Sequence, residues 1–143
     1  MELSLGTAQE MLRTLVSAAK GRGQRLSAVV VDQQGYEIAS VRMDGASWFT
    51  AGIACCKARS SAAFGRPSAG LAAMRERYPE VVRLAGEQLP FSVTDLPGGL
   101  PLFAGERLLG AVGVSGATPE EDVRAAGEAV AAFAERTEEE ADE

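Results

Sequence analysis

The side chain with the clearest chemical potential is Lys57, which falls on a stripe of helical spacing shared with Phe49, Ile53, Ser60 and Phe64. Because this stripe is mostly apolar, we expect the lysine stem to lie on apolar surface. Two interpretations stay open. Either the ammonium group reaches water while its methylenes pack, or it stands at a pocket wall, where it pairs with an anionic ligand or acts as a base.

A second candidate group is Arg42 with Asp44, at the end of an expected strand. Side chains two residues apart on extended backbone point the same way, so these two can form a local ion pair. If one face of the pair is free, the guanidinium can instead orient a carboxylate ligand. The residue types favour neither interpretation over the other.

Residues 110–116, Gly-Ala-Val-Gly-Val-Ser-Gly, have the order of a nucleotide-binding loop but not its spacing or its lysine. The helix expected to follow begins with Glu120, Glu121 and Asp122, whose charges would repel a phosphate at the helix N-terminus. We therefore expect no phosphate binding there. Ser115 lacks a histidine partner and is not expected to be a triad nucleophile.

Histidine is absent from the 143 residues, which excludes His-based triads and zinc or haem ligated by histidine. The two cysteines, Cys55 and Cys56, are adjacent. Neighbours on a helix point about 100° apart, and a disulfide between them would be strained. We expect small, partly buried hydrophobic side chains rather than reactive thiols. No set of residues converges on a metal site.

The charge of the chain is concentrated at one end. Five of the last seven residues are acidic, so the rest of the chain is near −1 although the total is −6. Without a basic excess, we expect no nucleic-acid partner. The pattern predicts a single domain over residues 1–136 and an acidic disordered tail over 137–143. No apolar run is long enough for a membrane span and the N-terminus lacks the pattern of a secretory signal, so we expect a cytoplasmic protein without a membrane partner.

Helical and strand signals alternate along the chain in a pattern typical of an α+β fold. A first helix should begin at a capping box of Thr7 and Glu10 and end near residue 21. The further elements expected are a hairpin of residues 28–31 and 36–43, a helix over 47–64, a short helix after Ser68, a short edge strand at 91–93, a second hairpin over 102–115 and a helix capped by Thr118.

With these segments in place, the chain resembles the GlcG/HbpS-like haem-binding family, whose domain also forms the C-terminal part of PduO-type corrinoid adenosyltransferases. The match extends over about residues 5–134. The residues that carry it are 30–32 with Gly35, 42–46, 57–58 with Ala62, 97–99 with Pro101, then Gly105, 109–117 and Asp122.

The resemblance implies a profilin-like α/β sandwich with a five-stranded antiparallel sheet flanked by helices, assembled into homo-oligomers from dimers to octamers. It also implies a small-molecule ligand, with haem or a corrinoid as the family default. The recurring polar positions of the family fall on Asp32, Arg42, Asp44, Lys57, Gly98, Gly99 and Ser115. Without histidine, any haem iron would need Cys55, Cys56, Tyr36, Tyr78, a methionine, or no strong axial ligand.

Three functions are therefore weighed. The first is a binding protein whose pocket lies between the helix of Lys57 and the turns at residues 98–99 and 113–115. The second is a small cofactor-independent enzyme of the isomerase, lyase or cyclase type, acting on a carbonyl or carboxylate metabolite through Lys57. In it, Arg42 holds the carboxylate and Asp44 or Asp32 moves protons. The third is a purely structural oligomer subunit.

Overall fold

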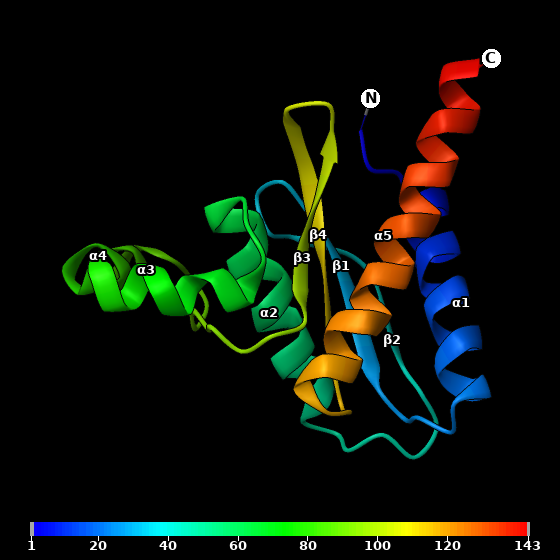
Figure 1. The fold of residues 1–143 in the computed structure, drawn as a ribbon, viewed down its shortest axis with the longest axis horizontal. Helices are drawn as coiled ribbons and strands as arrows, with labels where there is room; N and C mark the ends of the chain where they lie inside the picture. Colours follow the sequence, from blue (N-terminus) through cyan, green and yellow to red (C-terminus); the bar gives the residue numbers. More distant parts are fainter. Residues whose placement is uncertain (1, 143) are drawn as a thin grey trace.

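The computed structural model describes residues 2–142 and shows five α-helices and four strands within them. In chain order the elements are α1 (Leu5–Gly21), β1 (Ser27–Asp32), β2 (Glu37–Arg42), α2 (Thr50–Phe64), a 3-10 turn (Ser68–Gly70), α3 (Leu71–Arg77), α4 (Pro79–Gln88), β3 (Gly99–Ala104), β4 (Arg107–Ser115) and α5 (Pro119–Asp142). The expected α+β class is confirmed (Figure 1).

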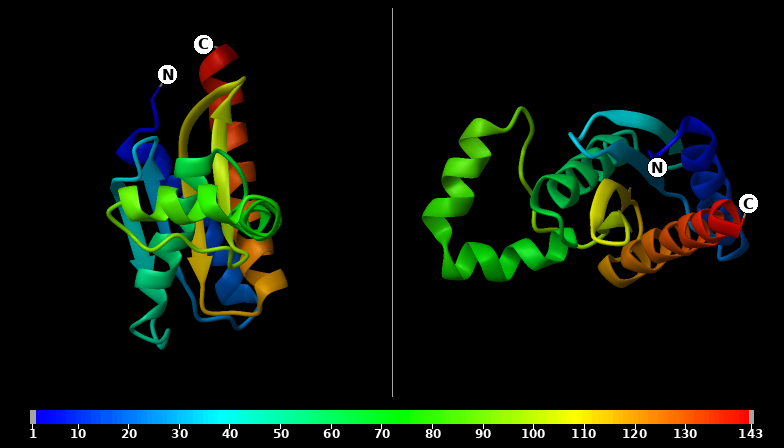
Figure 2. Two further views of the ribbon diagram at one scale, coloured as in Figure 1. Left: turned by 90° about the vertical axis from the view of Figure 1, so that its left-hand side faces the viewer. Right: turned by 90° about the horizontal axis from the view of Figure 1, so that it is seen from above.

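The four strands form one antiparallel sheet in the order β2-β1-β4-β3. Helices α1 and α5 cover one face and α2 covers the other (Figures 1 and 2). The expectation of five strands is wrong for the described residues, because residues 91–93 do not form an edge strand. The segment is held by side chains instead: the Phe91 ring lies under the Arg59 guanidinium, 4.6 Å away, and the Thr94 N–H donates to Ser60 Oγ.

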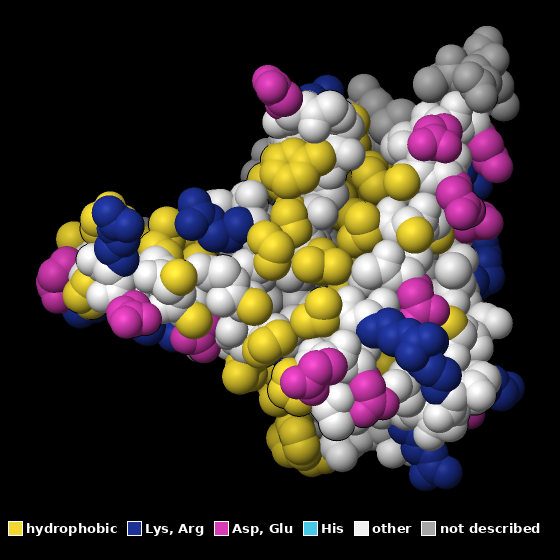
Figure 3. Space-filling model, in the orientation of Figure 1, with side chains coloured by type: hydrophobic (Ala, Val, Ile, Leu, Met, Phe, Trp, Pro, Cys, Tyr) yellow, Lys and Arg dark blue, Asp and Glu magenta, His cyan; other side chains and the backbone are white. Residues whose placement is uncertain are grey.

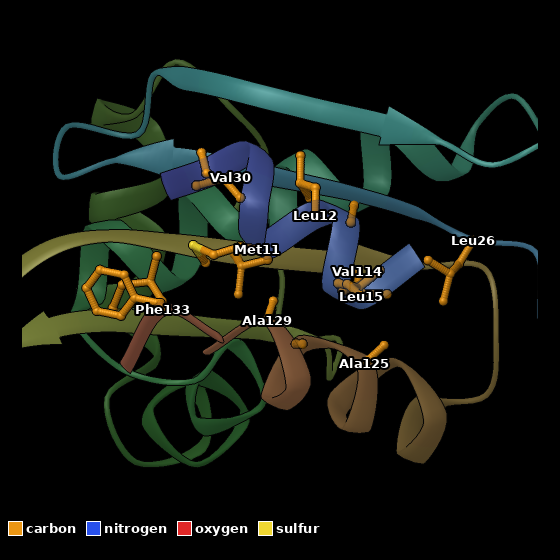
Figure 4. Packing of buried hydrophobic residues seen from close by; sticks show 14 of the residues in the cluster. Met11, Leu12, Leu15, Leu26, Val30, Val114, Ala125, Ala129 and Phe133 are labelled. Carbon is orange, nitrogen blue, oxygen red and sulfur yellow. The ribbon is translucent and has the colours of Figure 1, made fainter. Parts of the chain in front are cut away.

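The larger core lies between the sheet and the α1–α5 layer. Figure 4 shows Met11 and Leu15 of α1 meeting Ala129 and Phe133 of α5, with strand residues such as Val30 beneath them. These side chains are almost completely buried. The burial of such apolar surface is the main stabilising contribution to a domain of this size.

Helix α2 packs on the other face through small residues. Ala54, Ala58 and Ala62 are spaced four apart and are buried against the strands. A Cβ at Gly113 of β4 would overlap the Ala54 carbonyl oxygen, so glycine is needed for the helix to lie this close. This small-residue stripe faces the sheet. The stripe that includes Phe49 and Lys57, which was expected to be mostly apolar, is partly exposed to solvent, since Phe49 is 50% exposed.

Two helix boundaries differ from expectation. Helix α1 begins at Leu5 with Ser4 as N-cap, whose Oγ accepts from the Thr7 N–H, so the capping residue is not Thr7. The helix α5 continues to Asp142, through most of the segment expected to be a disordered tail, while residue 143 lies outside the described residues. Glutamate is a good helix former, and Glu140 lies 3.8 Å from Arg136 one turn earlier.

Helices α3 and α4 project from the domain as an arm (Figures 1 and 2). Among the described helices and strands, α4 packs only against α3. Its Val82 is buried, but Val81 and Leu84 are about half exposed, as is Tyr78 just before it. The helix was not expected from the sequence, although Pro79 at its first position is a start signal. Within residues 2–142, no helix is long and apolar enough to cross a membrane.

Candidate functional site

Lys57 is buried at a junction of three elements. Its side chain is 4% exposed, and Nζ donates to the Val114 carbonyl oxygen at 2.8 Å and to Asp122 Oδ2 at 3.1 Å. The other carboxylate oxygen of Asp122 accepts from the Ala117 N–H at 3.0 Å. The ammonium group of Lys57 is therefore buried and does not extend into water. A buried charge requires such partners, because an unpaired one is strongly destabilising.

The turns expected to line a ligand pocket with Lys57 are packed directly against it. Gly98 has a φ of 127°, and a Cβ there would stand 3.0 Å from Lys57 Nζ and 2.6 Å from the Val114 carbonyl oxygen. A Cβ at Gly99 would overlap the Lys57 carbonyl oxygen. Ser115 is also buried, one residue beyond Val114. The structure thus brings Lys57, Gly98, Gly99 and Ser115 together as a packed joint, and a ligand-contacting role for them stays a prediction.

The other predicted site residues lie elsewhere. Asp32 closes the turn between β1 and β2, where its Oδ1 accepts from the backbone N–H groups of Gln34 and Tyr36. Arg42 and Asp44 line a hollow with the end of α1. Arg42 pairs with Ser27 of β1, whose Oγ lies 2.9 Å from Thr50 Oγ1 of α2, so the Arg42 side chain leaves the sheet on the α2 face. Neither Arg42 nor Asp44 forms an ion pair within the described part of the chain, so the local pair, one of their two interpretations, is not formed. Lys57, Arg42 and Asp44 therefore do not form one site.

The feature that sequence reasoning missed is a groove beside the first half of α2, of about 470 Å³, called the α2 groove below. Its lining residues are Trp48, Phe49, Gly52, Ile53, Cys56, Ser92, Thr94 and Leu96. Trp48 is 80% exposed, and its ring meets that of Phe49 edge-on, with the centroids 5.9 Å apart. Figure 3 shows hydrophobic side chains gathered over α2 and down to the lower edge of this face. A surface this apolar is typical of a binding site.

The two adjacent thiols have different surroundings. Both cysteines are free and half-buried. Cys55 packs against the cluster under α2, and burial raises its pKa, with a smaller opposing effect from Arg59. Cys56 lies in the wall of the α2 groove. Because neighbours on a helix point about 100° apart, one thiol faces the sheet side and the other faces the groove.

One polar atom near the groove is without a partner. The Nε of Arg59 is buried and makes no hydrogen bond with any described residue. The guanidinium lies over the Phe91 ring, next in sequence to the groove residue Ser92. Arg59 is not among the lining residues of the groove, and its Nε lies 3.6 Å from the position of a Cβ at Gly35, in the turn between β1 and β2. Over the described residues, no group of three or more Cys, Asp or Glu is placed to hold a metal ion.

The model of a protein family described as haem degrading protein HbpS-like matches residues 3–131 of the chain. The chain belongs to the HbpS-like family. Its resemblance to that family, seen from the sequence, is confirmed. No curated protein matches this HbpS-like chain.

Solved structures of high similarity agree with this assignment. A double mutant of HbpS from Streptomyces reticuli is 28% identical, with 92% of this chain and 86% of that chain covered and a TM-score of 0.81. The protein ORFY of Klebsiella pneumoniae is 27% identical, with 94% and 92% covered and a TM-score of 0.83. A PduOC:heme complex is 25% identical, with 92% and 95% covered and a TM-score of 0.80.

The sequence carried signals for part of this arrangement. Ala54, Ala58 and Ala62 recur every four residues, which is the pattern of a helix face that approaches a sheet closely. Had that stripe been assigned to the sheet, Phe49, Ile53 and Cys56 would have been placed outside. The contribution of residues 92–96 to the groove had no local signal, because it depends on where the arm returns to the domain.

Proposed function

We propose that this HbpS-like protein binds haem in the α2 groove, with the thiolate of Cys56 as the axial ligand of the iron. The observation that carries the proposal is a thiol in the wall of an aromatic, apolar groove, in a chain without histidine. Family membership and the similarity to a protein solved in complex with haem support the ligand class.

The residues of the groove fit the chemistry of a tetrapyrrole. A flat apolar ring can cover Trp48, Phe49 and Leu96, each of which is about half exposed or more. A volume of 470 Å³ lies within the roughly 300–1,000 Å³ usual for small-molecule sites. Haem iron accepts cysteine thiolate as a ligand.

The distinction between the two cysteines makes the proposal specific. The thiolate is the metal-binding form of cysteine. Because burial raises the pKa of Cys55, that residue holds its proton more firmly, and it packs towards the sheet. Cys56 has access to the groove. We therefore assign ligation to Cys56, and when bound, the haem would supply iron-centred binding or redox chemistry.

The test is a visible-absorption titration with haemin of the wild type, Cys56→Ser and the matched control Cys55→Ser. We expect saturable one-to-one binding to the wild type and to Cys55→Ser, with a thiolate-type Soret spectrum. Cys56→Ser should lose that spectrum and bind more weakly. Trp48 is the only tryptophan of the chain, so its fluorescence should be quenched in parallel.

Other results of this titration would contradict the proposal. A flat titration would exclude haem, and the same titration with cobalamin would then test the corrinoid alternative. Equal loss of the thiolate spectrum in both variants, or in neither, would remove the assignment to Cys56. Binding without quenching of Trp48 would place the ligand outside the α2 groove.

The enzyme alternative stays a prediction. Lys57 Nζ bonds to Val114 and Asp122, and not to Asp44, within the described residues. The expected homo-oligomer is also a proposal. It is supported by the arm, whose exposed Tyr78, Val81 and Leu84 could pack against a second copy. A cytoplasmic location stays a prediction.

A further inference from the structure

An apolar groove lies between α1 and the edge strand β2, on the opposite side of the sheet from the α2 groove. Its volume is about 820 Å³, and its apolar lining includes Leu5, Leu12, Val16, Ile38 and Val41. Leu5 is 54% exposed at one end. The groove follows α1 from Leu5 to Lys20, a length of roughly 22 Å at a helical rise of 1.5 Å per residue.

This α1 groove opens at its far end into a second hollow of about 480 Å³, called the basic hollow below. The two share Val16, Lys20 and Val41 in their walls, so they are continuous. The basic hollow adds Arg25 and, at its edge, Arg42, whose side chain leaves β2 on the opposite face from Val41. An apolar channel thus leads to a cluster of cations.

The cations of the basic hollow are free to bind an anion. Lys20, Arg25 and Arg42 make no ion pair with any residue the structure describes. Asp44 is the acidic residue among those lining the hollow, so positive charge is in excess there. This excess is local, because the body of the chain is near −1. Guanidinium groups bind carboxylates through paired hydrogen bonds.

We propose that the α1 groove and the basic hollow together bind a long-chain carboxylate. The hydrocarbon chain lies along Leu12, Val16 and Val41, and the carboxylate lies between Lys20 and Arg25. The apolar chain is held by removal of its surface from water. The charged head fixes the direction of the ligand, since the opposite end at Leu5 carries no comparable cluster of cations.

The site is independent of haem binding. It lies on the α1 side of the sheet, and its lining residues include neither Cys56 nor Trp48. Failure of either proposal therefore leaves the other standing, provided that both ligands are titrated into the same variants.

The test is calorimetric titration with dodecanoate and with dodecanol, below the concentrations at which they aggregate. We expect dodecanoate to bind the wild type more tightly than dodecanol. Lys20→Gln should weaken dodecanoate by about tenfold, the ratio expected for one lost charge-assisted hydrogen bond, and should leave dodecanol unchanged. Asp44→Asn should tighten dodecanoate, because it removes a repulsive charge from the hollow.

Two further variants control the result. Arg107→Gln removes a cation from a different hollow, beside Asp32, and should have no effect. Val16→Trp fills the junction of the two cavities and should weaken both ligands, while haem binding is retained.

Three outcomes would overturn the proposal. The first is equal affinity for dodecanoate and dodecanol, or no response to Lys20→Gln and Asp44→Asn, which would indicate adsorption to apolar surface alone. The second is that neither ligand binds and that the protein is a dimer which dissociates when Val41→Arg is introduced. This result would show that a second copy covers the α1 groove. The third is displacement of dodecanoate by haemin, which would place haem in this groove instead.

Discussion

Lys57 Nζ lies 3.1 Å from Asp122 Oδ2, although the two residues are 65 positions apart and their side chains are only 4% and 5% exposed. Lys57 is on α2 and Asp122 is on α5, and these helices cover opposite faces of the sheet (Figure 1). The pair meets beyond the end of β4, where the Val114 carbonyl oxygen accepts a second bond from Nζ. It therefore joins the two helical layers around the sheet.

Removing one charge of this pair should cost more than removing both. Lys57→Met leaves the Asp122 carboxylate buried without its cation, and we expect a loss of about 3–5 kcal/mol in the free energy of unfolding. Adding Asp122→Asn should recover part of this loss, because the neutral amide still accepts from the Ala117 N–H. Urea unfolding of the wild type and both variants measures the effect. A Lys57→Met protein as stable as the wild type would show that the buried pair is not needed.

Substitution of Gly113 should separate α2 from the sheet. A Cβ there would overlap the Ala54 carbonyl oxygen, so we expect Gly113→Ala to destabilise the fold by about 1–3 kcal/mol, the usual cost of overpacking. Gly127→Ala in α5 is the matched control, since nothing lies within 4 Å of its Cβ position. The control should gain roughly 0.5–1 kcal/mol from helix propensity. The two variants should shift the midpoint of thermal unfolding in opposite directions. A Gly113→Ala protein that is more stable than the wild type would refute the close approach of α2.

Cys55 should react slowly with alkylating reagents at neutral pH. Burial raises the pKa of its thiol, which lowers the fraction present as the reactive thiolate. The reaction of Cys55 with iodoacetamide should therefore accelerate as the pH rises well above neutrality. Peptide mass spectrometry on the Cys56→Ser variant isolates this rate. A fast, pH-independent rate at neutral pH would contradict the assigned surroundings of Cys55.

The cap of α5 should be sensitive to acid. The Thr118 hydroxyl donates to Glu121, and Gln24 also bonds this carboxylate, so the pKa of Glu121 is lowered. A lowered pKa means that the carboxylate stabilises the fold above its unfolded pKa and that this contribution is lost as the pH falls through the folded pKa. Thr118→Ala should raise the pKa of Glu121 in an NMR titration and cost about 1 kcal/mol of stability through the lost N-cap. An unchanged titration would contradict the bond.

The arm should determine the oligomeric state if it packs against a second copy. Val81 and Leu84 are about half exposed on α4, so replacing both with glutamate should reduce the native mass without lowering helix content. Val123→Glu, at an exposed position of α5, is the control and should leave the mass unchanged. Light scattering after gel filtration measures both. A wild type that is monomeric, or a double variant that retains its mass, would exclude the arm as the interface.

Local signals identified much of the fold. The turn of residues 32–35, the second hairpin and the start of α5 after Thr118 were predicted and are present, because turn glycines and N-caps act over three or four residues. The sequence also has no histidine, which excludes imidazole ligation. It contains the short motifs on which the resemblance to the HbpS-like family rests.

Tertiary structure decided which of these residues meet. Lys57 was correctly singled out, but its partner Asp122 has no local relation to it, and only the packing of α2 and α5 on opposite faces brings them together. Arg42 and Asp44 were expected to act with Lys57, yet the ammonium group of Lys57 bonds to Val114 and Asp122 instead. Alanines and Gly113 let α2 lie close to the sheet, and this contact turns Phe49 and Cys56 outwards into a groove. A helix pattern gives several possible faces, and the strand that it packs against selects one.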